Sequence, residues 1–192
     1  MQELCKPCRT TLDAAKLVED HGIKITADDI KRKELNMPAI SYIAGVCAHA
    51  ALKKLPCESC ALNLTTEGSY NFLIDILIEN LSRGALKFPQ PVVVNAVLQT
   101  QLVLEKLSEK ENATWFHAPG NQRELLLCLS KHFLSDSEDL DVCFKGHHPD
   151  TVLHNVLHAA ANTLLKNYVN VRTDNLMTKK VEEQRRKLRT LK

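Results

Sequence analysis

Apolar residues recur every three or four positions along most of this chain, which is the period of a helix with one buried face. In residues 39–55 this stripe holds Ile40, Ile43, Cys47, Ala51 and Leu55. The same period recurs at residues 11–20, 26–35, 69–81, 91–107, 121–134 and 149–169. The intervening residues 56–68, 82–90, 109–120 and 135–148 are expected to be loops. The pattern predicts an all-α fold, an irregular helical domain of about seven helices.

Residues that start or stop helices support several of these boundaries. Pro56 ends the helix before it, because proline has no N–H to donate and clashes with the preceding turn. Gly84 suits the position just after a helix end. The run Pro91-Val-Val-Val94 is also compatible with a strand. Its β-branched residues fall in the first turn of a periodic segment, which favours a helix.

Composition is that of an ordinary globular protein. The chain has 192 residues, of which 44% are hydrophobic and 25% charged, and a net charge of +2. Overall charge therefore does not indicate a nucleic-acid partner. No apolar run reaches the roughly 18 residues of a membrane span, and no secretory signal follows Met1, so we expect no membrane partner. We expect two short helices in residues 1–36, a helical domain at 37–174 and a basic helix or tail at 175–192.

Two short motifs suggest a metal site. The chain has seven cysteines, which we expect to be reduced in the absence of a signal peptide, so metal binding or core burial is favoured over disulfides. Cys57-Glu-Ser-Cys60 follows a helix stop, and Cys143-Phe-Lys-Gly-His147 lies in a loop before the next helix. Exposed turns let such pairs converge on one ion. We predict one structural zinc site held by Cys57, Cys60, Cys143 and His147.

Other ligand sets stay open at this point. His148 competes with His147 as the fourth ligand, because the spacing does not separate them. Cys5-Lys-Pro-Cys8 would build a four-cysteine site with the Cys57 pair. Their separation is longer than the usual spacing of about 15–20 residues.

The remaining histidines and cysteines fit structural roles better. His154 and His158 stand four residues apart on a predicted helix, where we expect a half-buried pair with hydrogen-bond partners. Cys47 and Cys128 lie on apolar helix faces and are expected in the core.

Catalytic motifs are missing from this sequence. It contains neither a Gly-rich phosphate loop nor a serine nucleophile elbow, and its carboxylates are not gathered into a two-metal set. We therefore expect no enzymatic activity. Divalent-metal-dependent DNA cleavage that is lost on mutating Glu34 would instead support an active nuclease or transposase.

The C-terminal end, in contrast, is strongly basic. Its Lys and Arg residues would contact a DNA phosphate backbone or act as a nuclear import signal, or lie solvated on a helix. The candidate DNA contacts are Lys179, Lys180, Arg185, Arg186, Lys187 and Arg189.

Three blocks, in this order, resemble P-element-type transposases and their THAP-associated relatives. Tyr42-Ile-Ala-Gly45, followed by a helix and Cys57-x-x-Cys60, is similar to the family's Tyr-Ile-Ala-Gly-Tyr-Val…Cys-x-x-Cys stretch. Arg83-Gly84-Ala-Leu86-Lys-Phe-Pro89 resembles its Arg-Gly-Gly-Leu-x-x-Pro segment. Cys143-x3-His147, with Leu164-Leu-Lys-Asn-Tyr168, resembles its Cys-x-x-x-His…Leu-Lys-Asn-Tyr tail. The blocks cover about residues 40–170. Val46-Cys47 and Ala85 depart from the pattern.

The resemblance implies the region downstream of the catalytic RNase H-like core, whose Asp-Asp-Glu set carries out strand transfer. We therefore expect a transposable-element-derived, non-catalytic C-terminal domain. Its zinc-stabilised helical scaffold would support DNA-complex assembly in the nucleus. Its partners would be DNA, through the basic tail, and other transposase domains or a second copy. The alternative is a zinc-free helical protein–protein interaction module without a DNA role.

Overall fold

The computed structural model describes residues 36–55, 57–69, 71–82, 84–109, 122–135 and 144–190. These residues form six helices and two short strands. In chain order they are α2 (Met37–Lys54), α3 (Glu58–Ala61), β1 (Thr65–Thr66), α4 (Phe72–Ser82), β2 (Phe88–Pro89), α5 (Pro91–Ser108), α7 (Gln122–Ser135) and α8 (Pro149–Thr190). The helices predicted at residues 11–20 and 26–35 lie outside the described residues.

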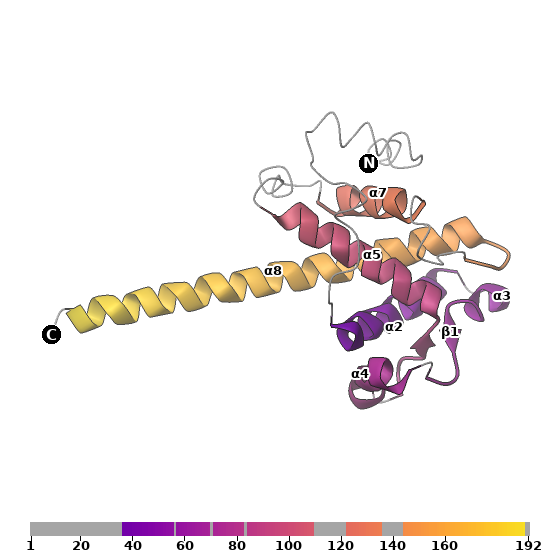
Figure 1. Ribbon diagram of the computed structural model, residues 1–192, viewed down its shortest axis with the longest axis horizontal. Coiled ribbons are helices and arrows are strands. Elements are labelled where there is room, and N and C mark those ends of the chain that lie inside the picture. The colour runs from indigo at the N-terminus through magenta and orange to yellow at the C-terminus, as the bar shows by residue number, and fades with distance from the viewer. Residues whose placement is uncertain are drawn as a thin grey trace.

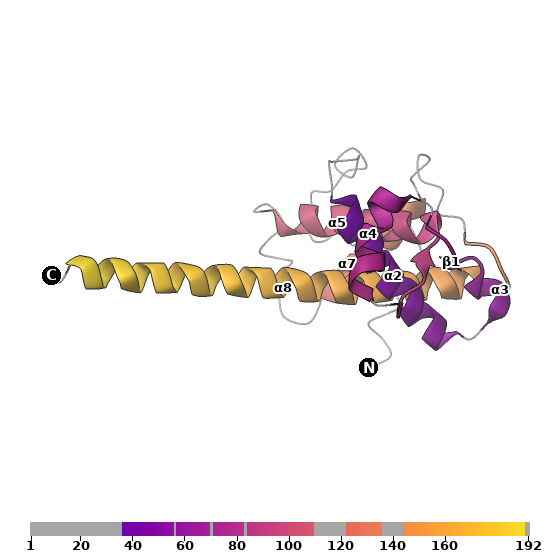
Figure 2. The same cartoon turned by 90° about the horizontal axis from the view of Figure 1, so that it is seen from below.

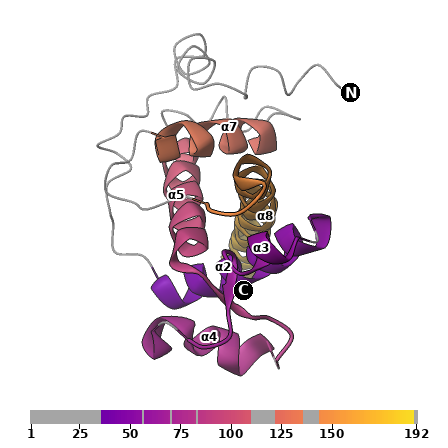
Figure 3. The ribbon, with the colours of Figure 1, turned by 90° about the vertical axis from the view of Figure 1, so that its right-hand side faces the viewer.

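Four helices enclose the core. Helix α2 packs against α8 and α5, and α7 packs against both α5 and α8 (Figures 1 and 3). Each helix contributes an apolar stripe, as its periodicity predicts. Val97, Leu126, Leu129, Val156 and Leu157 are among the fully buried side chains. Cys47 and Cys128 are also buried, which confirms their predicted core positions.

Helix α4 covers the other side of α2 (Figure 3). It buries Ile78 and one charged residue, Asp75. The Asp75 carboxylate accepts hydrogen bonds from Ser41 Oγ of α2 at 2.6 Å and from Ser69 Oγ at 2.8 Å. A buried carboxylate needs such donors, because its desolvation is otherwise costly. This network holds the segment before α4 against α2.

A two-stranded antiparallel sheet, which the periodicity did not predict, ties together two regions expected to be loops. Thr65 pairs with Pro89, and Thr66 with Phe88. Beyond this ladder, Gln90 N donates to Leu64 O at 3.0 Å. Strands of two residues carry too little alternation to be recognised in a sequence. The sheet connects the segment after α3 to the start of α5. The short helix α3 also lies within an expected loop.

Helix α8 continues through the expected boundary at residue 174. It is one helix of 42 residues, so it is about 63 Å long. Its buried residues, from Val152 to Leu164, lie in the first half, and the second half extends away from the body (Figure 2). Residues 170–175 lack Pro and Gly, so the loss of apolar periodicity there does not stop the helix. Beyond Val169 the structure describes the side chains of Lys179 and Glu182 alone.

The helices predicted at residues 39–55, 69–81, 91–107, 121–134 and 149–169 are all present. Helix α5 begins at Pro91, so the helical interpretation of Pro91-Val-Val-Val94 is confirmed. The chain is mostly helical, in agreement with the predicted fold class. Among the described residues, no helix combines the length and the apolar character that a membrane crossing requires.

Candidate functional site

The Cys57–Cys60 turn is built by the end of one helix and the start of a very short one. The last hydrogen bond of α2 runs from Leu55 N to Ala51 O, and Cys57 N then donates to Leu55 O at 2.9 Å. Cys57 has an extended backbone and precedes α3, whose first bond joins Ala61 N to Cys57 O. The turn leaves Cys57 partly exposed, whereas Cys60 is buried, with 1% of its surface accessible.

The segment before α8 packs onto this turn. Phe144 is buried in the core, and Gly146 follows it with φ +112°. A Cβ atom at Gly146 would lie 3.1 Å from Cys60 Sγ and 3.4 Å from Ser59 O. The chain therefore passes close over Cys60, in a conformation that favours glycine. The hydrophobic periodicity did not predict this contact between Gly146 and Cys60. The one indication in the sequence was that a glycine directly precedes the predicted ligand His147.

His147 then lies beside Cys57. The distance from Cys57 Sγ to His147 Nδ1 is 3.9 Å. Two ligands of a tetrahedral zinc ion, with Zn–S and Zn–N bonds near 2.3 and 2.0 Å, would be about 3.6 Å apart. The observed distance is thus close to that of a shared ion, and it equally suits a weak thiol–imidazole hydrogen bond.

The predicted ligands are not all placed. Cys143 lies outside the described residues, as do Cys5 and Cys8. Within the described ranges, no three His, Cys, Asp or Glu side chains gather closely enough to hold a metal. The structure thus brings Cys57, Cys60 and the Gly146–His147 segment to one place.

His148 is next to the same turn but has a different role. Its carbonyl accepts a hydrogen bond from Val152 N at 2.9 Å and so belongs to the start of α8. Its ring stands edge-on to that of His147, with centroids 6.2 Å apart. His147, in contrast, has a ring nitrogen near the sulfur of Cys57.

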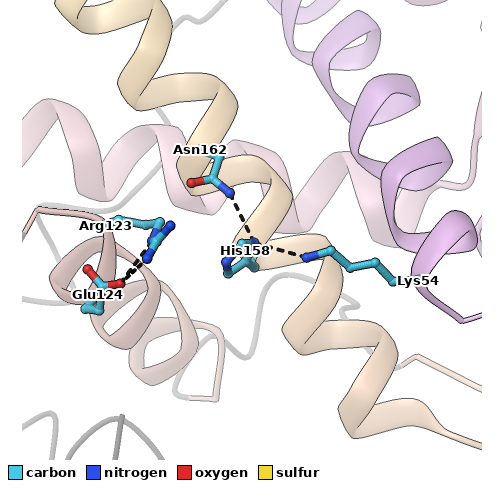
Figure 4. Close-up of polar contacts among 5 residues, drawn as sticks. All are labelled: Lys54, Arg123, Glu124, His158 and Asn162. Carbon is cyan, nitrogen blue, oxygen red and sulfur yellow. Dashed lines mark hydrogen bonds and ion pairs between the residues drawn. The ribbon is translucent and has the colours of Figure 1, made fainter. Parts of the chain in front are cut away.

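The predicted pair His154 and His158 belongs to a second polar cluster, and Figure 4 shows His158 with its polar partners. His158 Nδ1 lies 3.1 Å from Asn162 Nδ2 and 3.4 Å from Lys54 Nζ of α2. The ring centroids of the two histidines are 6.2 Å apart. The prediction of a half-buried, hydrogen-bonded pair holds for His158, whereas His154 is exposed.

Partial desolvation of the two rings lowers the pKa of both histidines, and nearby positive charges lower it further. For His154 these charges belong to Lys131 and Lys54. The pKa of His158 is lowered by burial, then by Lys54, Arg123 and His154, and Glu124 opposes this shift. Both imidazoles therefore favour the neutral form more than a free histidine does.

The predicted DNA contacts of the C-terminal end all belong to the second half of α8. Lys179 is exposed. The side chains of Lys180, Arg185, Arg186, Lys187 and Arg189 lie outside the described set, so their arrangement around the helix stays a prediction.

Comparison with known proteins identifies the family. The family model described as "DNA transposase THAP9, C-terminal domain" matches residues 28–178. This range includes Cys57-x-x-Cys60, Cys143-x3-His147, the apolar core and the first half of α8. No curated protein and no solved structure gave a significant match. Since the matched range covers most of the chain, this protein belongs to the family of the C-terminal domain of the DNA transposase THAP9.

Proposed function

We propose that this chain is a non-catalytic, zinc-stabilised scaffold within a transposase-type DNA complex. The observation that carries the proposal is the convergence of the Cys57–Cys60 turn with the Gly146–His147 segment, which are far apart in sequence. Cys57, Cys60, Cys143 and His147 would hold one zinc ion. The ion would join the end of α2 to the start of α8, and no bond would be made or broken there.

The described residues fit this ion chemically. Thiolate and imidazole are the donors that structural zinc prefers, and the Sγ–Nδ1 distance of 3.9 Å is close to that of two ligands on one ion. The sheet and the Gln90–Leu64 hydrogen bond hold the segment after the turn against the start of α5. The proposed fourth ligand, Cys143, directly precedes the buried Phe144, which anchors that end of the segment.

Metal analysis of purified protein tests the zinc site. We expect about one zinc per chain in the wild type, and loss of zinc in Cys57→Ser and Cys143→Ser. Cys5→Ser is the matched control and should keep its zinc. Zinc-free wild-type protein, or equal loss in Cys5→Ser, would contradict the proposed ligand set.

DNA contact through the basic end of α8 is a separable part of the proposal. Deleting residues 179–192 should weaken binding to duplex DNA of any sequence and reduce its dependence on salt. Unchanged binding after this deletion would assign the basic residues to a solvated helix or a nuclear import signal. The family supports a nuclear location for this domain.

One observation favours a protein-interaction role as the second candidate. Phe72, Leu73 and Leu81 of α4 are 59–74% exposed, and Leu62, which follows α3, is 76% exposed. Such side chains suit a protein partner. Zinc-free protein that folds fully and fails to bind DNA would favour this alternative.

A further inference from the structure

We propose that Lys54, His158 and Asn162 form a binding site for a phosphate group of a duplex DNA backbone on the helical body. The site is separate from the zinc motifs and from the basic end of α8. The inference deepens the proposed function: it rests on the proposed DNA role and does not depend on the zinc ion.

The three side chains converge from two helices. Lys54 comes from the last turn of α2, and His158 and Asn162 from α8 (Figure 4). Lysine only donates hydrogen bonds, so His158 Nδ1, 3.4 Å from Lys54 Nζ, acts as an acceptor. The ring is then neutral, with its proton on Nε2. In the free protein the donors of Lys54 and Asn162 are therefore directed toward one nitrogen.

The charges around this point favour an anion over a metal ion. Lys54, Lys131 and Arg123 are the positive groups that act on the two histidines, and they come from α2 and α7. Among the described residues, Glu124 is the negative group that acts on His158, and it is bound to Arg123 at 2.6 Å. A metal ion would be repelled by Lys54, whereas a phosphate oxygen would accept from Lys54 and Asn162 together.

Binding of an anion would also change the protonation of the histidines. A phosphate beside His158 stabilises the imidazolium, which then donates where the neutral ring accepted. Affinity should therefore rise as pH falls from about 8 to about 6, with uptake of protons. Lys54, Lys131, Arg123 and His154 oppose protonation in the free protein, and the bound phosphate offsets them.

Duplex DNA is the occupant that the observations favour. The chain belongs to a DNA transposase family, and the site is exposed at the end of α2. Lysine and protonated histidine contact phosphates without reading bases, so the contact should be independent of sequence.

The test measures binding of the full chain to a short duplex by fluorescence anisotropy, across salt and pH. Lys54→Ala should weaken binding about tenfold and lower the salt slope by about 0.9. His158→Asn should flatten the rise in affinity at low pH. Lys53→Ala is the matched control, since it removes the same charge from the adjacent exposed position. It should weaken binding less than threefold. Thermal melts followed by circular dichroism establish that each variant is folded.

The outcomes separate this inference from the proposed function. Unchanged binding in Lys54→Ala and His158→Asn, with loss on deleting residues 179–192, overturns the inference and leaves the DNA role of the tail. An equal loss of DNA affinity in Lys53→Ala and Lys54→Ala also overturns the inference. Such a result would mean that the positive charge of this region attracts DNA without a specific phosphate contact at Lys54. Wild type that binds inorganic phosphate at His158, detected by histidine NMR shifts, but no duplex overturns DNA as the occupant. Zinc content, measured on the same samples, tests the scaffold independently.

Discussion

Replacing Gly146 by alanine tests the packing of the Cys143–His147 segment on the Cys57–Cys60 turn. At φ +112° a side chain is strained, at a cost of about 1–3 kcal/mol. The added Cβ would also lie 3.1 Å from Cys60 Sγ, so either the cysteine or the segment must move. We expect Gly146→Ala to lower the free energy of unfolding by about 2–3 kcal/mol. That corresponds to a fall in Tm of roughly 4–12 °C for a chain of this size.

Two other glycines separate the sources of this loss. Gly84 also has a positive φ, +79°, but among the described residues, its chain neighbours aside, no atom lies within 4 Å of its added Cβ. Gly84→Ala should therefore show the backbone strain without the contact, about 1 kcal/mol. Gly68 has neither feature. Gly68→Ala should be neutral or stabilising by up to about 1 kcal/mol, because it restricts the unfolded chain.

Urea unfolding followed by circular dichroism measures the three variants, with zinc content determined on the same preparations. Gly146→Ala should be the least stable, and it should also bind less zinc at the proposed site, because either Cys60 or the segment that carries His147 is displaced. If Gly146→Ala unfolds at the same urea concentration as Gly68→Ala, the packing of Gly146 on Cys60 is refuted. An equal loss of unfolding free energy in Gly146→Ala and Gly84→Ala would support backbone strain at Gly146 and contradict its close contact with Cys60.

Three further predictions concern the rest of the domain. Ile78→Ala should destabilise the domain by about 2–5 kcal/mol in urea unfolding, because this side chain is fully buried between α4 and α2; a loss below 0.5 kcal/mol would mean that α4 is not packed. Burial raises the pKa of the Cys47 thiol to about 12, so Cys47 should resist alkylation in native protein at pH 8 and react after unfolding, as mass spectrometry would detect; rapid native labelling would contradict its burial. Because the pKa of His158 is lowered from 6.5, stability is fully present above that pH and falls as pH drops below it; in phosphate-free buffer His158→Asn should reduce this fall, and an unchanged pH profile would argue against the shift.

The helical elements could be predicted because their information is local. Ile40, Cys47, Val97 and Leu129 recur at the helical period and are buried as that period requires. Pro91 marked the start of α5 despite three valines behind it. A strand of two residues is too short to show a repeating pattern of apolar positions. The sequence therefore did not predict the sheet of Thr65–Thr66 with Phe88–Pro89.

For the candidate site, the sequence indicated possible donor residues but not their surroundings. Cysteine and histidine spacing marked Cys57, Cys60 and His147 because few other roles require such pairs. The spacing of residues in the sequence did not predict the hydrogen-bond partners of His158. Lys54 is separated from it by most of the domain, and the two meet only because α2 packs against α8.

The sequence by itself determined the helical class of this protein, the family to which it belongs and the residue types available for a metal site. These follow from local periodicity and from ordered short motifs. Tertiary structure alone decided which segments meet: Gly146 over Cys60, His147 beside Cys57, and Lys54 against His158. The physical reason is that helix packing is set by the combined fit of several apolar faces, so the contact between two distant polar groups is a consequence that neither segment encodes alone.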